Sequence, residues 1–308
     1  MAKRRWLHAI VAGSGAGTGL SLRMIKSSLA LFLLLVAPAQ AEFATPWAPS
    51  ARSAARLIAA GGLHDGVYRV GTEIRLNPKT VTYWRNPGDA GAPPVFSFAQ
   101  SQNVAEAKVQ YPAPRRIAEA GGVEAFGYEV GVVFPVLVTP LDPALPVVLD
   151  LALKYAACER ICVPAEAKLH LDLAPQAQDG EFAEKIAAAL ARVPVAATLA
   201  AGGIAPVAGA IKPSWLVTSQ KMIGQTPPQG AFTKGLLQEL DPADMFAEAP
   251  AGWYFDTRPG DRPGQFLLIL AERPRDTAIP SVTVRLTLTG LGSASETEAT
   301  LDVGAPKP

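Results

Sequence analysis

Short apolar runs separated by proline and glycine dominate the chain between residues 47 and 173. In the clearest run, Leu169, Leu171 and Leu173 alternate with polar residues, the period of two that a half-buried strand shows. Runs of this kind between turn residues predict about eight short strands, packed as a sandwich of two antiparallel sheets. The other predicted strands include 67–76, 80–84, 95–98, 105–110, 128–138 and 147–155, with a hairpin turn at 77–79.

The pattern changes at 181–192, where Phe182, Ile186 and Leu190 recur every fourth residue and predict a helix. Asp179, just before this segment, is the predicted N-cap. The helix would separate the first β-rich part of the chain from the second.

Beyond the helix, the Ala- and Gly-rich stretch 195–209 is interpreted as a loose connector. A second β-rich part follows at 211–303, with its clearest strands at 264–271 and 282–288. We therefore expect an all-β protein, in which a short helix and linker join a first β-sandwich to a second β-rich domain that is also a sandwich.

Residues 1–41 are interpreted as a signal peptide. Arg23 and Lys26 flank Met24, an apolar run follows at 29–36, and the segment ends on the small–x–small pattern of Ala39-Gln40-Ala41 that precedes cleavage. Translation from Met1 and translation from Met24 both fit this pattern. The apolar run is too short to span a bilayer. We therefore expect an exported, soluble mature protein without a membrane span.

Removing the leader changes the charge balance. The leader carries five of the 28 basic residues and none of the 27 acidic ones, so the mature part has 28 − 5 = 23 basic residues and a formal net charge of 23 − 27 = −4. This balance gives no basic footprint for nucleic acid. No glycine-rich phosphate loop, metal-ligand cluster or Ser/His/Asp pattern is evident, so we expect no cofactor and no metal.

Cys158 and Cys162 are the only cysteines in the chain. A disulfide closing so short a loop stabilises the fold by only about 2 kcal/mol in the chain-entropy model, and ring strain would reduce that further. Small disulfides at a loop end are more often exchangeable. The spacing therefore favours a redox pair over a structural staple. Metal binding is a weaker alternative, because only His64 and His170 remain as further ligands of this kind in the mature chain.

Charged neighbours would tune the reactivity of the thiols. Arg160 and Lys154 would favour the thiolate form, whereas Glu159 would oppose it, and the sequence leaves the balance open. Glu159 and Glu166 are also candidate proton acceptors.

Four segments, in order along the chain, carry a resemblance to a known family. They are YWRNPGDAG at 83–91, YPAP at 111–114, FGYE at 126–129 and KYAACERICVP at 154–164. Over roughly residues 45–175 the chain resembles the N-terminal periplasmic domain of the thiol:disulfide interchange protein DsbD and its copper-tolerance relatives.

The resemblance implies an immunoglobulin-like domain whose cysteine pair passes electrons by thiol–disulfide exchange. It implies that Cys162 attacks and Cys158 resolves, although the reverse order stays open. It also implies a loop that caps the cysteines until a partner docks, which in this chain would be Phe126, Gly127 and Tyr128. Gly127 would allow that loop to bend. The implied partners are oxidised thioredoxin-like periplasmic proteins, such as disulfide isomerases or cytochrome-maturation factors.

The chain departs from the best-known members in two respects. Their cysteines are further apart, and those members continue into a membrane electron carrier and a thioredoxin-like domain. We therefore expect a protein-disulfide reductase, or an interchange component without the membrane domain, that is supplied by a separate membrane electron donor. The expected division is a signal peptide at 1–41, an immunoglobulin-like redox domain at 42–175, a helix and linker at 176–210, and a second β-rich domain at 211–308.

The alternative is a non-catalytic periplasmic binding module in which the disulfide only stiffens a hairpin. The second domain would then serve as a docking or spacer module. The remaining conspicuous residues are interpreted as structural. Tyr83, Trp84 and the aromatic run 253–255 are expected to be core residues, and His64 and His170 are expected at the surface.

Overall fold

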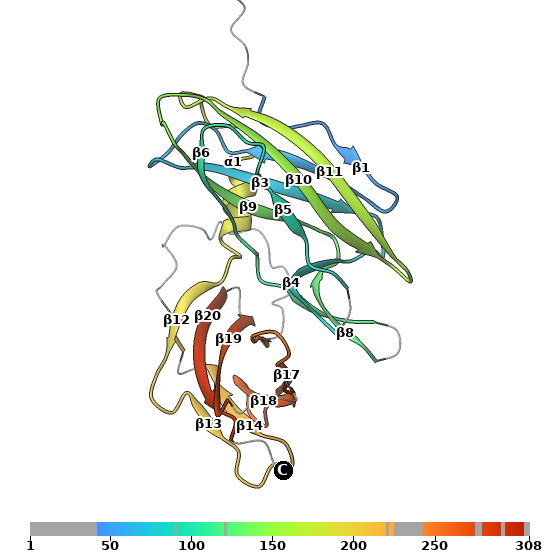
Figure 1. Cartoon of the computed structure of the whole chain (residues 1–308), viewed down its shortest axis with the longest axis vertical. Coiled ribbons are helices and arrows are strands. Elements are labelled where there is room, and N and C mark those ends of the chain that lie inside the picture. Colours follow the sequence, from blue (N-terminus) through green and yellow to red (C-terminus); the bar gives the residue numbers. More distant parts are fainter. Residues whose placement is uncertain are drawn as a thin grey trace, which may run out of the picture. The chain divides into compact units, whose positions relative to one another are not determined.

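The computed structural model describes residues 42–89, 91–119, 122–219, 222–224, 243–274, 279–290 and 293–304, all within one compact unit (Figure 1). The predicted signal peptide lies outside the described residues. The described residues are nearly all β, with one α-helix among them, which confirms the predicted fold class.

Two facing sheets make the first domain. The larger sheet has the antiparallel order β1-β2-β3-β9-β6, and the smaller has the order β11-β10-β5. The strands are β1 (Ala48–Pro49), β2 (Ser53–Ala59), β3 (Tyr68–Leu76), β5 (Val95–Ser97), β6 (Val104–Val109), β9 (Gly131–Pro140), β10 (Val147–Cys158) and β11 (Cys162–Leu173). Their inward-facing side chains form the main core, which contains Val70, Phe134, Leu149 and Leu171. This confirms the immunoglobulin-like sandwich.

A third, smaller sheet of the first domain has the order β4-β8-β7 and consists of β4 (Thr82–Gly88), β8 (Glu124–Tyr128) and β7 (Arg115–Ala118). We call it the cover sheet. Its register aligns Tyr83 with Gly127, Arg116 with Phe126 and Ile117 with Ala125.

The turn at 77–79 is present but does not join a hairpin. The Thr80 N–H bonds to the Asn77 carbonyl at 3.1 Å, and Lys79 takes a positive φ of 63°. However, β3 pairs within the larger sheet and β4 within the cover sheet. The predicted strand 128–138 is likewise divided between β8 and β9, because the chain bends at 129–130 and changes sheet.

The helix α1 (Ala183–Leu190) packs against β9 and β3, with Ile186 fully buried. The predicted N-cap is wrong: Phe182 precedes the helix without a side-chain cap, and Asp179 contacts His64 at 3.1 Å instead. The reason is a turn over 181–182 that delays the helix and carries Asp179 out of reach of its first amides.

Two further sheets build the second β domain, in the orders β15-β12-β20-β19-β16 and β13-β14-β18-β17. The strands are β12 (Val195–Leu199), β13 (Ile204–Pro206), β14 (Ser214–Thr218), β15 (Met222–Gly224), β16 (Asp244–Glu248), β17 (Tyr254–Pro259), β18 (Gln265–Glu272), β19 (Ser281–Gly290) and β20 (Ser293–Asp302). They enclose a separate core that includes Val217, Leu268, Val284 and Leu286. Phe255 lies in this core and Trp253 packs against it, as predicted, while the Tyr254 hydroxyl donates to Asp89.

The stretch 195–209, predicted to be a loose connector, contains two strands. β12 pairs in parallel with β20 and antiparallel with β15, and β13 pairs with β14. Their side chains are mostly exposed or half-buried, so the sequence lacks the apolar alternation by which a strand is recognised.

None of the helical structure in the described part of the chain has the length and apolar character needed to cross a membrane.

Candidate functional site

The candidate site lies at the end of the long β10–β11 hairpin, whose two strands run side by side in Figure 1. The strands pair without interruption from Val147 opposite Leu173 to Cys158 opposite Cys162. The two cysteines form a disulfide, with their Cα atoms 4.0 Å apart. Residues 159–161 make the connecting turn. The alternation of apolar and polar residues along β11 fixes this register, because a slip of one residue would move its leucines out of the core.

The two sulfur-bearing residues lie in different environments. Cys158 is 3% exposed and belongs to a small cluster with Tyr83, Ile117 and Ala125 of the cover sheet. Cys162 is exposed, and beside it Ile161 is 72% exposed. A molecule approaching from solvent therefore reaches Cys162 first.

The start of β4 is held directly against the end of β10. The Val81 N–H bonds to the Cys158 carbonyl at 2.8 Å, and the Cys158 N–H bonds to the Val81 carbonyl at 2.9 Å. The Thr82 hydroxyl donates to the Ala156 carbonyl at 2.9 Å. Both backbone polar groups of Cys158 are thus satisfied, and the buried half of the disulfide is fixed to the cover sheet.

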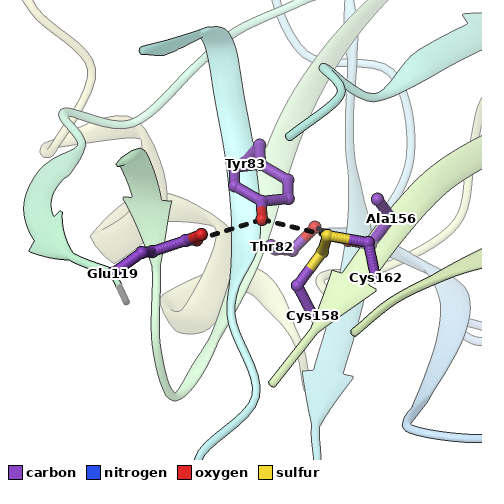
Figure 2. The surroundings of a disulfide bond; sticks show 6 residues. All are labelled: Thr82, Tyr83, Glu119, Ala156, Cys158 and Cys162. Atoms are coloured by element: carbon purple, nitrogen blue, oxygen red, sulfur yellow. Dashed lines mark hydrogen bonds between the residues drawn. A yellow bond between two sulfur atoms is a disulfide. The ribbon is translucent and has the colours of Figure 1, made fainter. Parts of the chain in front are cut away.

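The side chain of Tyr83 makes a polar contact with the disulfide (Figure 2). Its ring is fully buried, and its hydroxyl donates to Glu119 Oε1 at 3.1 Å and lies 3.5 Å from Cys162 Sγ. Burial, together with the charge and the hydrogen bond of Glu119, raises the pKa of Tyr83 above its ordinary value of 10.0. The phenol is therefore protonated at neutral pH and keeps a hydrogen to donate.

The comparisons with known proteins agree with this geometry. Residues 51–174 match the family model described as "Thiol:disulfide interchange protein DsbD, N-terminal". These residues therefore belong to the DsbD N-terminal domain family. The match begins before β2 and ends just after β11, so it takes in both sheets of the first sandwich and the disulfide hairpin.

A solved structure is also similar: the N-terminal periplasmic domain of ScsB from Proteus mirabilis, with a TM-score of 0.60 at 18% identity. The alignment covers 85% of this chain and 99% of that one. Residues 51–174 make up only 124 of 308 residues, so the shared fold extends from the DsbD N-terminal domain into the second β domain. The search of curated proteins gave no match.

Within the DsbD N-terminal domain, the predicted cap residues are placed away from the sulfur atoms. Phe126 and Tyr128 lie in strand β8, not in a loop, and their side chains belong to the main core, whereas the side chain of Ala125 belongs to the cysteine cluster. The reason is the alternation along β8, which turns Phe126 to the opposite face from Ala125. Tyr83 holds the position beside Cys162 that was predicted for Phe126.

Gly127 is required for a different reason from the one predicted. A Cβ atom there would collide with the carbonyl oxygen of Thr82 on the neighbouring strand. Gly127 therefore permits the close approach of β8 to β4 where Tyr83 passes, and it does not bend a loop.

The predicted tuning residues lie in the hairpin turn. Glu159 pairs with Arg52, and Arg160 is exposed. Lys154 pairs with Glu166 across the hairpin at 3.4 Å, with both side chains about two-thirds exposed. Because they are this open to solvent, such charges act weakly on the sulfur atoms.

Sequence reasoning missed Glu119 and assigned Tyr83 to the core alone. Tyr83 is indeed buried. In the sequence, its contact with the disulfide was indicated only by its place at the start of the YWRNPGDAG segment. Glu119 follows Ala118 at the end of β7 and belongs to no repeating pattern, so its role becomes visible only once β4 and β7 are placed on either side of β8. His64 and His170 are exposed, as predicted. The part of the chain that the structure describes contains no group of three or more potential metal ligands.

Proposed function

We propose that this chain is a periplasmic thiol–disulfide exchange protein, which passes electrons through Cys158 and Cys162 to oxidised thioredoxin-like proteins. The observation that carries the proposal is the difference between the two cysteines: Cys162 is exposed at a hairpin end, while Cys158 is 3% exposed beside it. An exchange reaction needs one sulfur that a partner can reach and a second that is held close by to complete the reaction.

The reaction follows from this arrangement. In the reduced protein the Cys162 thiolate attacks one sulfur of the partner's disulfide, and the partner's other sulfur leaves as a thiolate and takes up a proton. The Cys158 thiolate then attacks Cys162 Sγ, closes the internal disulfide and releases the partner's second thiol. Two electrons and two protons pass to the partner. By analogy with the DsbD family, we propose a membrane electron carrier as the donor that restores the dithiol.

Several observations support the setting and the partner class. The matched family is described by thiol–disulfide interchange, and the similar ScsB domain is described as periplasmic. The pattern at 1–41 is that of an export signal. Ile161 adds an exposed apolar side chain next to Cys162, and burying that side chain against a docked protein would favour the contact.

We assign the covering of the reactive sulfur to Tyr83. Its buried ring provides an apolar wall, and its neutral hydroxyl, which donates to Glu119 in the oxidised protein, can turn its hydrogen toward a thiolate at Cys162. Phe126, Gly127 and Tyr128 act indirectly, because they hold the cover sheet together.

Trapping with single-cysteine variants tests the proposal. Cys158→Ser leaves the accessible thiol without its resolving partner and should accumulate a mixed disulfide with an oxidised thioredoxin-like protein. Cys162→Ser should trap much less, because its remaining thiol is buried. Equal trapping, or none, by the two variants would contradict the proposed order of attack.

A redox titration against glutathione and dithiothreitol separates this function from a non-catalytic binding module. An exchange pair should titrate near the potentials of thioredoxin-like proteins, whereas a pair still oxidised well below about −300 mV would be structural.

A further inference from the structure

The three strands of the cover sheet present opposite faces to two different parts of the molecule. On one face Tyr83 of β4, Ile117 of β7 and Ala125 of β8 form a cluster with Cys158. On the other face an adjacent residue of each strand contacts the second β domain; these residues are Trp84, Arg116 and Phe126. Successive side chains of a strand point to opposite faces of the sheet. A residue that contacts the second domain is therefore bonded directly to a residue that faces the cysteine cluster.

Arg116 makes the most extensive of these contacts. Its Nε and Nη2 atoms bond to both carboxylate oxygens of Asp244 in β16, each at 3.0 Å. Nη2 also donates to the Thr257 hydroxyl at 2.8 Å and to the Met245 carbonyl at 3.1 Å. Nη1 pairs with Glu124 of the cover sheet itself at 2.7 Å. One half-buried guanidinium therefore joins β7, β8, β16 and β17.

Strand β4 makes a parallel set of polar contacts. The Arg85 guanidinium bonds to both carboxylate oxygens of Glu248, at 2.7 and 2.9 Å, and to Glu296 of β20. The Asn86 side chain donates to the Ala247 carbonyl at 2.9 Å. Charge-assisted hydrogen bonds are stronger than bonds between neutral groups, so these contacts hold β4 against the second domain.

Phe246 provides the apolar part of the contact. It belongs to β16 of the second domain, yet its fully buried ring packs in the core of the first. The ring centroids lie 4.9 Å from Phe126 and 5.9 Å from Trp84, both in edge-to-face arrangements. The far side of the cover sheet is therefore closed by a side chain of the second domain.

The cover sheet depends on such support. Its strands are only four, five and seven residues long, and a small sheet of this size is marginal without packing on a face. The same sheet shields Cys158 and carries Tyr83 to Cys162. We infer that the second β domain, through Arg116 and Phe246, positions the cover sheet over the disulfide and so controls access to the buried sulfur. Arg116 is thus a positioning residue that acts on cysteines it does not touch.

Thiol labelling in the full chain tests this inference. The protein is reduced with dithiothreitol, treated with iodoacetamide, and the labelling of each cysteine is followed by mass spectrometry. In Arg116→Ala we expect Cys158 to react about tenfold faster than in the wild type, since losing a charged hydrogen bond populates local opening of the cover sheet by about that factor. Cys162, already exposed, should react at a similar rate in both. Arg116→Lys, which retains the charge, should restore part of the protection.

Arg56→Ala is the matched control. Arg56 pairs with Glu73 at 2.7 Å, and its side chain is 18% exposed, against 20% for Arg116. It lies in β2 and has no part in the cover sheet. Its loss should destabilise the fold to a similar degree without changing the labelling of Cys158. Equal acceleration by Arg56→Ala would mean general unfolding and would overturn the inference.

If Arg116→Ala does not fold, Phe246→Leu can be used to test the same inference. This milder change removes the ring contacts with Phe126 and Trp84 and should also speed the labelling of Cys158. Unchanged labelling in every folded variant would overturn the inference. The readout uses only small reagents, so its result is independent of whether the pair exchanges with a protein partner.

Discussion

At the scale of single residues, a buried tyrosine contacts the disulfide. Tyr83 is buried, and its raised pKa follows from burial and from the negative charge of Glu119. A neutral phenol next to a sulfur that becomes a thiolate on reduction can donate a hydrogen bond to the charged form. The same hydroxyl bonds to Glu119 in the oxidised protein. After reduction, the Tyr83 hydroxyl could therefore donate its hydrogen bond to the Cys162 thiolate instead of to Glu119.

Removing the Tyr83 hydroxyl should slow the reaction of the accessible thiol. In Tyr83→Phe the Cys162 thiolate loses a donor worth about 1 kcal/mol, so alkylation of reduced Cys162 at a fixed neutral pH should slow roughly fivefold. The measurement is the second-order rate with iodoacetamide. Tyr155→Phe is the matched control, because its hydroxyl bonds to Ser53 at 2.7 Å on the same hairpin and should not affect the rate. A faster reaction in Tyr83→Phe would mean that the hydroxyl shields the sulfur more than it stabilises the thiolate.

The sequence predicted the cysteines themselves but not the residues around them. A close pair without competing cysteines is visible in any listing of the chain, and the motif at 154–164 pointed to its chemistry. The structure places the side chain of Phe126 in the main core, which the motif could not indicate, because a motif fixes a segment and not the direction of its side chains. Glu119 and Arg116 act through partners 36 and 128 residues away, separations at which single-sequence patterns carry no information.

At the scale of elements, the β10–β11 hairpin holds the cysteines opposite each other independently of the disulfide. The two strands pair along their whole length, and their inward leucines lie in the main core. Opening the bond leaves this register in place. The two thiols of the reduced protein therefore stay close, as an exchange reaction requires.

Loss of the disulfide should consequently cost little stability. We expect reduction of the wild-type protein to lower its free energy of unfolding by about 2 kcal/mol, the value for so short a loop. Urea denaturation with and without dithiothreitol measures this difference. Cys158→Ala combined with Cys162→Ala, measured without reductant, controls for incomplete reduction. A loss above about 4 kcal/mol would instead indicate a bond needed to hold the hairpin.

Elements with clear alternation were predicted from the sequence, and those without it were missed. The hairpin strand at 169–173 shows apolar residues at every second position. In contrast, β2 is buried on both faces and reads SAARLIA, which has no period of two. The turn at 77–79 was predicted correctly, because turn formation depends on neighbouring residues. The pairing of the two strands that flank it was not predicted, because their partner strands lie far away in the sequence.

At the scale of the whole molecule, the two β domains share buried groups. Phe246 lies in the core of the first domain, and the Arg85 and Arg116 guanidiniums each bond to carboxylates of the second. Separating the domains would expose an aromatic ring and leave half-buried charges unpaired, and both changes carry a large free-energy cost. The domains should therefore unfold together.

Calorimetry can detect this coupling directly. We expect the wild-type protein to show a single thermal transition, with equal calorimetric and van't Hoff enthalpies. Phe246→Ala removes the shared aromatic contact, so it should lower Tm by roughly 10 °C and resolve two transitions. Phe255→Ala is the control: it removes the same side chain from the second core, where Phe255 packs on Trp215, and should lower Tm while leaving one transition. Two transitions in the wild-type protein would show that the interface does not couple the domains, and the cover sheet would then need another support.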